Sequence, residues 1–354
     1  MITEFYNKKI SGVLTVLPEN CYQFDDEIAE EESVKAKRLK RIMGYGKRYR
    51  VKAETTMSDM MIYGLRYLLD TNKVKKEDIG AIVVVTLSQD YYVPQISNII
   101  HGELGLPNNI MCIDINSACA GYIVGLAQAF MLLEHLNNKK VLLFTGDIFN
   151  RKASDQELKY TSPPFGGDVA NITVVENDNR DDQNPILYNF YTDGSQRDVL
   201  VAHEGGFRQL LSVEQVADTR YNIPFRGIDM DGSAVFNFAQ KEVPILIEEI
   251  LKIGNVSKDK IDWYLFHQPN KFMLQKLAER LEIPYEKMPM DVVEDYGNSN
   301  SGTIPVAMTS YIQSDLLEQK RLCCLAGFGA GLTWTSILME IGCLDFCENI
   351  DSNL

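Results

Sequence analysis

A cysteine flanked by small residues is the first candidate for chemistry. Cys119 lies in Ser117-Ala118-Cys119-Ala120-Gly121, between a short predicted strand and an apolar pattern typical of a helix. Unpaired backbone amides and the dipole at a helix N-terminus lower a thiol pKa, so this position favours a nucleophilic cysteine. The alternative is a buried structural cysteine in a tight strand-to-helix crossing, and the motif alone favours neither.

Three further positions could assist such a thiol. His267 ends a predicted buried strand, and Asn298 lies one element later in Tyr296-Gly297-Asn298. Taken singly, such a histidine is more often a packed residue and such an asparagine a turn residue. The turn Gly329-Ala330-Gly331 lacks the spacing of a nucleotide-binding loop, but its amides could donate to an oxyanion. The alternative for this turn is a tight hairpin between two core strands.

The elements that must position these residues occur twice. A charged loop leads into a buried strand in Lys76–Thr86 and again, 182 positions later, in Lys258–His267. A helical pattern ending in a turn precedes each, and a second strand follows each, Lys140–Gly146 and Arg321–Gly327, at an offset of 181. Three elements in one order at nearly constant spacing indicate an internal duplication of α/β layers.

The duplication predicts two halves, 1–180 carrying the cysteine and 181–354 carrying His267 and Asn298. The Asp-, Asn-, Gly- and Pro-rich segment of roughly 151–225 is predicted to form long surface connections rather than a domain. If the halves pack about a pseudo-twofold axis, equivalent segments converge, and Cys119, His267 and Asn298 meet at the centre.

Composition narrows the class of protein. The chain has 354 residues, 45% apolar and 24% charged, with a formal charge of −14. The negative charge argues against a nucleic-acid binder, and no apolar run approaches the length of a membrane helix. Seven irregularly spaced cysteines without a signal peptide favour free thiols in the cytoplasm. Cys343 and Cys347 lack the second ligand pair of a zinc site, so we expect no metal.

Several motifs together resemble the β-ketoacyl-acyl carrier protein (ACP) synthase III family. They occur in the family's order over nearly the whole chain: Ser117–Tyr122, Gly167-Asp168, Thr192–Ser195, Met230–Phe236, His267-Gln268-Pro269-Asn270, Tyr296–Pro305 and Gly329–Trp334.

The resemblance implies a thiolase-like fold, a duplicated five-layer αβαβα arrangement, in a homodimer without metal or bound organic cofactor. It implies that Cys119 takes an acyl group from an acyl-CoA or acyl-ACP thioester. His267 and Asn298 would then assist decarboxylative condensation with malonyl-ACP, as in fatty acid biosynthesis. Backbone amides of Cys119 and of Gly329, Ala330 and Gly331 would form the oxyanion hole, and substrate contacts are implied at Arg151, Asn270 and Val93.

Val93 stands where the family has a larger residue that closes the partner subunit's acyl pocket, which predicts a longer or branched acyl group. Eight Lys or Arg residues within positions 35–50 are typical of a solvated helix face. The functional alternative is a landing area for the acidic carrier protein.

Other activities stay open at this stage. The nearest alternative is an acyltransferase that moves the Cys119-bound acyl group to a hydroxyl or amine without condensation. A hydroxymethylglutaryl-type synthase is disfavoured because no glutamate is marked as its acid/base. An inactive scaffold subunit is disfavoured because the Cys, His and Asn are all present.

Overall fold

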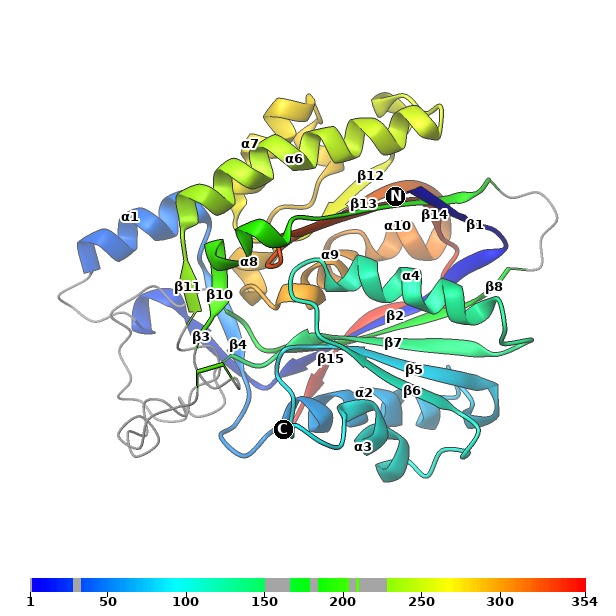
Figure 1. Ribbon diagram of the computed structural model, residues 1–354. Helices are drawn as coiled ribbons and strands as arrows, with labels where there is room; N and C mark the ends of the chain where they lie inside the picture. The colour runs from blue at the N-terminus through cyan, green and yellow to red at the C-terminus, as the bar shows by residue number, and fades with distance from the viewer. Residues whose placement is uncertain (1, 28–32, 150–165, 179–183, 204–207, 210–227) are drawn as a thin grey trace.

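The computed structural model describes the chain except residues 1, 28–32, 150–165, 179–183, 204–207 and 210–227. Two mixed sheets dominate it (Figure 1). The six-stranded sheet, in the order β15-β2-β8-β7-β5-β6, comprises β2 (Lys8–Pro18), β5 (Ile79–Val85), β6 (Met111–Ile115), β7 (Lys140–Asp147), β8 (Val169–Asn177) and β15 (Phe346–Ser352). The five-stranded sheet, in the order β1-β9-β14-β13-β12, comprises β1 (Ile2–Phe5), β9 (Ile186–Thr192), β12 (Trp263–Phe266), β13 (Lys320–Gly329) and β14 (Thr333–Gly342).

Helices fill three layers around these sheets (Figure 1). The outer layers are α2 (Met57–Asp70) with α3 (Ile96–Glu103) on the six-stranded sheet and α6 (Gly232–Ile253) with α7 (Lys271–Leu281) on the five-stranded sheet. Between the sheets lie α4 (Gly121–Leu133) and α9 (Thr303–Tyr311). The smaller elements are α1 (Ser33–Met43), α8 (Val292–Tyr296), α10 (Gln313–Glu318) and the strand pairs β3 (Asn20–Gln23) with β4 (Lys47–Arg50) and β10 (Leu200–Ala202) with β11 (Ile228–Met230).

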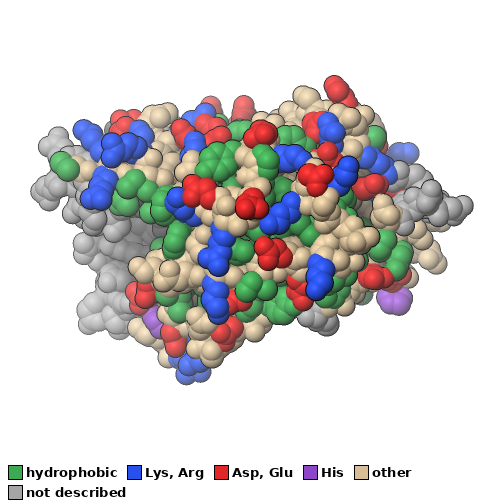
Figure 2. Space-filling view, turned by 90° about the horizontal axis from the view of Figure 1, so that it is seen from above, with side chains coloured by type: hydrophobic (Ala, Val, Ile, Leu, Met, Phe, Trp, Pro, Cys, Tyr) green, Lys and Arg blue, Asp and Glu red, His purple; other side chains and the backbone are tan. Residues whose placement is uncertain are grey.

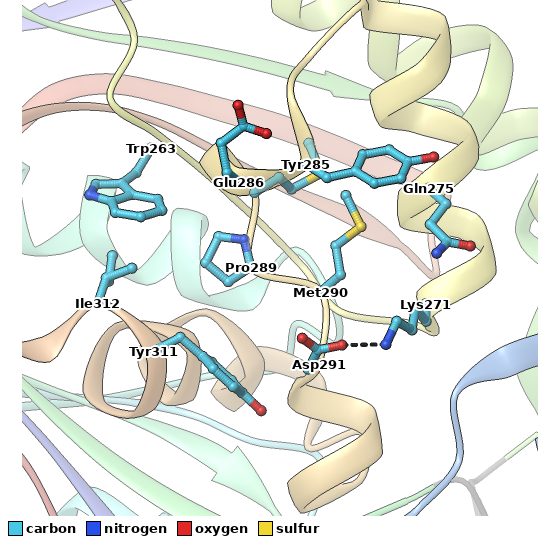
Figure 3. Close-up of a pocket in the computed structure, with 11 residues that line it drawn as sticks. Trp263, Lys271, Gln275, Tyr285, Glu286, Pro289, Met290, Asp291, Tyr311 and Ile312 are labelled. Carbon is cyan, nitrogen blue, oxygen red and sulfur yellow. Dashed lines mark ion pairs between the residues drawn. The ribbon is translucent and has the colours of Figure 1, made fainter.

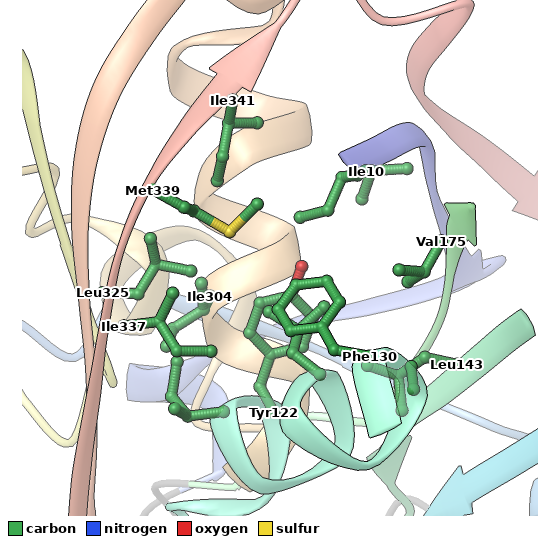
Figure 4. Close-up of a cluster of buried hydrophobic side chains, with 14 of the residues drawn as sticks. Ile10, Tyr122, Phe130, Leu143, Val175, Ile304, Leu325, Ile337, Met339 and Ile341 are labelled. Carbon is green, nitrogen blue, oxygen red and sulfur yellow. The ribbon is translucent and has the colours of Figure 1, made fainter. Parts of the chain in front are cut away.

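The central layer explains the unusual composition of α4. This helix is apolar nearly all round, and Tyr122, Leu126 and Phe130 are fully buried. A helix between two sheets has no solvent face, so it needs apolar residues on every side. Its partners come from both sheets, including Leu143 of β7 and Ile337 of β14 (Figure 4).

The two sheets repeat one topology, as the duplicated sequence predicts. β5 pairs parallel with β7, and β12 pairs parallel with β13. β7 then pairs antiparallel with β8, and β13 with β14. The duplicated five-layer α/β prediction is therefore confirmed.

The ends of the chain cross between the sheets. β1 pairs with β9 in the five-stranded sheet, while β15 pairs with β2 in the six-stranded sheet. The predicted boundary between residues 180 and 181 falls in 179–183, outside the described residues, and stays a prediction.

The segment 151–225 is not only surface connection, so that prediction is wrong. It contains β8 and β9, each hydrogen-bonded inside a sheet. The turn-rich stretch beginning at Asn177 hid these strands, because their apolar runs are short and interrupted by Asn171 and Asn189, which are buried and paired inside the core. Part of the segment lies outside the described residues.

In the described part of the chain, no helix is both long and apolar enough to cross a membrane.

Close approach of β13 to the start of α4 should make Gly327 intolerant of a side chain. A Cβ at Gly327 would lie 2.8 Å from the Ala120 Cα and 3.2 Å from the Ala120 oxygen, so backbone would have to move. We expect Gly327→Ala to lower the free energy of unfolding in urea by about 1–3 kcal/mol. Gly102→Ala is the matched control, because nothing lies within 4 Å of that position in α3, and it should be neutral or stabilising. Equal effects at both sites would contradict this account.

Candidate active site

Cys119 lies where the first half of the chain meets the hairpin of the second. It precedes α4, whose N-cap is Ala120, and its side chain is partly exposed. A Cβ built on Gly329 would lie 2.7 Å from the Cys119 Cβ and 3.1 Å from Sγ. The β13–β14 turn, containing Ala330 and Gly331, therefore begins directly against the thiol, and only glycine fits at its first position.

This turn is fastened to a second loop. The Leu332 N–H donates to the Asp193 carbonyl at 3.0 Å, and the Asp193 N–H donates to the Leu332 carbonyl at 2.9 Å. Two reciprocal backbone bonds hold the turn rigidly beside Cys119. Preorganised backbone is what an oxyanion site needs.

His267 continues β12 toward the same centre. Its N–H donates to the Ala326 carbonyl at 2.8 Å, and its ring is buried. Its Nδ1 lies 2.9 Å from the Thr303 hydroxyl, which donates to the Asn300 carbonyl at 3.0 Å and accepts the Gln268 N–H at 3.2 Å. Since the hydroxyl has one proton, this network favours Nδ1–H donating to it and leaves a lone pair on Nε2.

Asn298 lies in a tightly bound turn after α8. Its carbonyl accepts the Gly167 N–H at 3.1 Å, and its Oδ1 accepts the Asn300 N–H at 2.9 Å. Because Oδ1 is engaged, the carboxamide orientation is fixed and its NH₂ group points away from Asn300 as a donor.

Asn300 connects the three predicted residues. Its Oδ1 lies 3.5 Å from the Cys119 Sγ, its N–H holds Asn298, and its carbonyl is bonded to the Thr303 hydroxyl that contacts His267. Cys119, His267 and Asn298 therefore belong to one hydrogen-bonded cluster built from both halves.

The environment determines the charge of the candidate residues. Although Cys119 as a residue is partly exposed, its sulfur is surrounded by protein atoms, and this burial, followed by the nearby charge of Asp147, raises the pKa of the thiol to about 12. The expectation that the helix N-terminus lowers this pKa is wrong here, because desolvation outweighs the backbone contribution. Burial lowers the pKa of His267 to about 3. The site thus holds a protonated thiol and a neutral imidazole.

The other predicted contacts are more dispersed. Val93 lies in the loop between β5 and α3 with 82% of its surface exposed. Asn270 caps α7, accepting the Met273 N–H at 2.9 Å. Arg151 lies outside the described residues. Within the described ranges, no cluster of three His, Cys, Asp or Glu side chains could hold a metal ion.

An open cavity lies on another part of the molecule, away from the candidate site. It has a volume of about 350 Å³ beside α7 and is lined by Trp263, Met290, Tyr311 and others (Figure 3). Lys271 and Asp291 form a 2.6 Å ion pair at its edge. None of Cys119, His267 and Asn298 lines it, so its shape carries no information on the acyl group.

Sequence reasoning missed Asn300, Thr303 and Asp147. Asp147 directly follows a glycine at the end of a predicted strand, the position at which parallel sheets commonly present functional side chains. Asn300 and Thr303 lie within five residues of Asn298, and their polarity in an otherwise buried segment was the available signal.

Known proteins match this architecture. A family model described as 3-oxoacyl-[ACP] synthase III matches residues 113–194, and the model of its C-terminal part matches residues 251–341. The chain is 30% identical over 298 residues to the β-ketoacyl-[ACP] synthase III of Synechocystis sp., covering 84% of this chain and 87% of that one. It is 29% identical over 325 residues to that of Latilactobacillus sakei, covering 92% and 97%.

A solved structure matches over the whole length. The 3-oxoacyl-(ACP) synthase of Burkholderia xenovorans superimposes with a TM-score of 0.88 at 27% identity, covering 99% of both chains.

The layered fold, with a cysteine at the start of a central helix, defines a condensing enzyme of the thiolase fold. More narrowly, the chain belongs to the β-ketoacyl-ACP synthase III family, an acyltransferase class.

Burial of neutral His267 should make stability depend on pH. Its pKa falls from 6.5 to about 3 on folding, so below pH 6.5 the unfolded chain binds a proton that the folded protein excludes. The free energy of unfolding should then drop by about 1.4 kcal/mol per pH unit until about pH 3. Between pH 7.5 and 5.0 the wild type should lose about 2 kcal/mol more than His267→Gln in urea titrations. Equal losses would contradict the assignment.

Proposed function

We propose that this condensing enzyme loads an acyl group on Cys119 and joins it to a malonyl thioester carried by ACP, with loss of carbon dioxide. The observation that carries the proposal is the cluster in which Asn300 links Cys119, Asn298 and, through Thr303, His267. A nucleophile and two groups that can contact a carbonyl share one site.

In the loading step the Cys119 sulfur attacks the acyl thioester. The thiol proton passes to the Nε2 lone pair of His267, the new S–C bond forms, and the donor leaves as a thiolate that takes a proton from water. The backbone amides of Cys119 and of the Gly329–Gly331 turn hold the transient oxyanion. Donors fixed before the reaction stabilise such charge by roughly 3–4 kcal/mol each.

In the condensation step the bond between the malonyl carboxylate and the α-carbon breaks. Carbon dioxide leaves, and the electron pair of that bond stays on the thioester as an enolate. The Asn298 NH₂ group and protonated His267 donate hydrogen bonds to the enolate oxygen. The negative charge of this oxygen stabilises the protonated form of His267. The enolate carbon attacks the acyl carbonyl, the S–C bond breaks, and Cys119 recovers its proton from His267. No metal and no organic cofactor takes part in these steps.

Three further residues are proposed to contact the substrates. In a homodimer, exposed Val93 would reach the partner's acyl pocket, where its small size leaves space for a longer or branched acyl chain. Asn270 would contact the substrate only through the Nδ2 end of its side chain, since Oδ1 caps α7. Arg151 is proposed to contact coenzyme A when acyl-CoA is the donor. The site of action would be the cytoplasm.

The basic helix α1 is proposed as the docking surface for ACP. Lys37, Arg38 and Arg41 are exposed, and basic side chains gather at the end of the molecule where α1 lies (Figure 2). Gly44, just after α1, packs against Lys271, the first residue of α7. Since Lys271 follows His267 by four residues, this basic surface lies near the strand end that carries the site.

Two substitutions should separate the half-reactions. Cys119→Ala should abolish acyl loading from a mixed pool of acyl thioesters, whereas Asn298→Ala should load normally and lose at least about 100-fold of condensation rate. Intact mass measures loading and identifies the acyl group, and malonyl-dependent release of carbon dioxide measures condensation. Acetyl as the only adduct would refute the role of Val93. Acyl transfer to a hydroxyl or amine without carbon dioxide would refute condensation.

Neutralising the basic side chains of α1 should weaken the binding of carrier-bound substrates only. Lys37→Gln, Arg38→Gln and Arg41→Gln together should raise the KM for malonyl-ACP about three- to tenfold and leave that for malonyl-CoA unchanged. Lys252→Gln with Lys260→Gln is the matched control, since both side chains are exposed at the far end of α6 or just beyond it. An equal rise for both substrates, or an equal effect of the control, would reject the docking surface.

A further inference from the structure

The Asn300 side chain separates the Cys119 sulfur from a buried carboxylate. Its Nδ2 donates to the Asp147 Oδ2 at 2.8 Å, and its Oδ1 lies 3.5 Å from the Cys119 Sγ. The three residues come from the end of β7, the start of α4 and the turn before α9. The mechanism above does not use this connection.

Asp147 is fixed by donors on its other side. Its Oδ1 accepts the Thr86 hydroxyl at 2.8 Å, the Leu87 N–H at 2.7 Å, and both the hydroxyl and the N–H of Ser88 at 3.0 and 3.1 Å. The side chain has no exposed surface. Burial raises the pKa of Asp147, while the Asn300 amide and these donors act in the opposite direction by stabilising the carboxylate. Asn300 donates to its remaining oxygen, so Asp147 is held as an acceptor.

An acceptor at Asp147 dictates which end of Asn300 faces the sulfur. The NH₂ group must point to the carboxylate, so the carbonyl oxygen points to Cys119. That oxygen can accept an S–H proton, but it repels a thiolate. The Asn300 backbone adopts a left-handed φ of 50°, a conformation that asparagine tolerates. This conformation sets the direction in which the Asn300 side chain leaves the backbone.

We propose that the Asp147–Asn300 pair is a positioning device that keeps Cys119 in its thiol form until an acyl donor occupies the site. The proposal rests on the proposed function of Cys119 as nucleophile. The S–H bond points to Asn300, so the free enzyme offers little thiolate to other electrophiles. Loading requires the proton to leave for His267, which becomes favourable when the oxyanion amides engage an acyl carbonyl.

The environment of Cys119 also favours the thiol over the thiolate. Burial comes first and the Asp147 charge second among the causes that raise the pKa of the Cys119 thiol. Among the described residues, Asp147 is the acidic group linked to the sulfur, through Asn300, whereas His267 joins the same cluster through Thr303 and is neutral.

Asp147→Asn tests the device without changing its shape. The new carboxamide keeps its oxygen on the Thr86, Leu87 and Ser88 donors and turns its NH₂ group to Asn300. Asn300 must then flip, presenting NH₂ to the sulfur, where it stabilises a thiolate. We expect alkylation of Cys119 by iodoacetamide at pH 8, without substrate, to accelerate about tenfold or more, since each unit of lowered thiol pKa gives tenfold more thiolate.

A double-mutant cycle tests whether Asp147 acts through Asn300. Asn300→Gly preserves the left-handed backbone and removes the side chain, and in this background Asp147→Asn should add no more than about twofold. Comparing rates within one background cancels any change in access to the thiol. Asp168→Asn is the matched control, since this buried carboxylate accepts the Val51 and Phe149 N–H groups; it should change the rate less than about twofold. Alkylation of exposed Cys343 serves as an internal reference.

An unchanged alkylation rate in folded Asp147→Asn would overturn the proposal. So would equal acceleration by Asp147→Asn with and without the Asn300 side chain. Failure of the proposed function would appear separately, as absence of an acyl adduct on wild-type Cys119.

Discussion

The rest of the structure depends on the close approach of the second sheet to the start of α4. Gly327 leaves no side chain between β13 and the Ala120 backbone, and Gly329 leaves none between β13 and the Cys119 side chain. Because the contact at Gly327 is backbone against backbone, the distance between the halves is set there by van der Waals radii and not by adjustable side chains. The thiol of one half therefore meets the turn of the other in a fixed geometry, which is the condition for preorganised electrostatics.

Polar contacts then fix the rotation of one half on the other. The Ser301 hydroxyl donates to the Val85 carbonyl at the end of β5 and accepts the Gly146 N–H of β7. These bonds tie the turn that carries Asn298 to the strand ends that carry Asp147. The site therefore lies at the contact between the duplicated units, and its residues are held in one rigid arrangement although Cys119 and Asn300, for example, lie 181 positions apart in sequence.

Sequence reasoning reached the duplication of α/β layers and the three residues of the cluster because each leaves a local pattern, whereas the five-layer order followed from the family resemblance. It missed β8 and β9, whose asparagines find their partners in segments distant in sequence, on β2 for Asn171 and on β14 and α6 for Asn189. It also missed Asn300 and Asp147, since their relation exists only after the halves have packed. The wrong pKa direction for Cys119 has the same origin. The helix end is visible in the sequence, but the desolvation and the buried charge that outweigh it come from tertiary structure.

The crossing of the terminal strands bears on how the chain is made. β2 is among the first strands to leave the ribosome, yet its parallel neighbour β15 comes after residue 345. Until β15 has been synthesised, β2 is the border strand of this sheet, and the open edge of a long apolar strand can recruit strands from other chains. In the folded protein β15 is the border instead, and it is shorter and less buried than β2. A chain truncated ahead of β15 therefore keeps β2 as its unprotected edge.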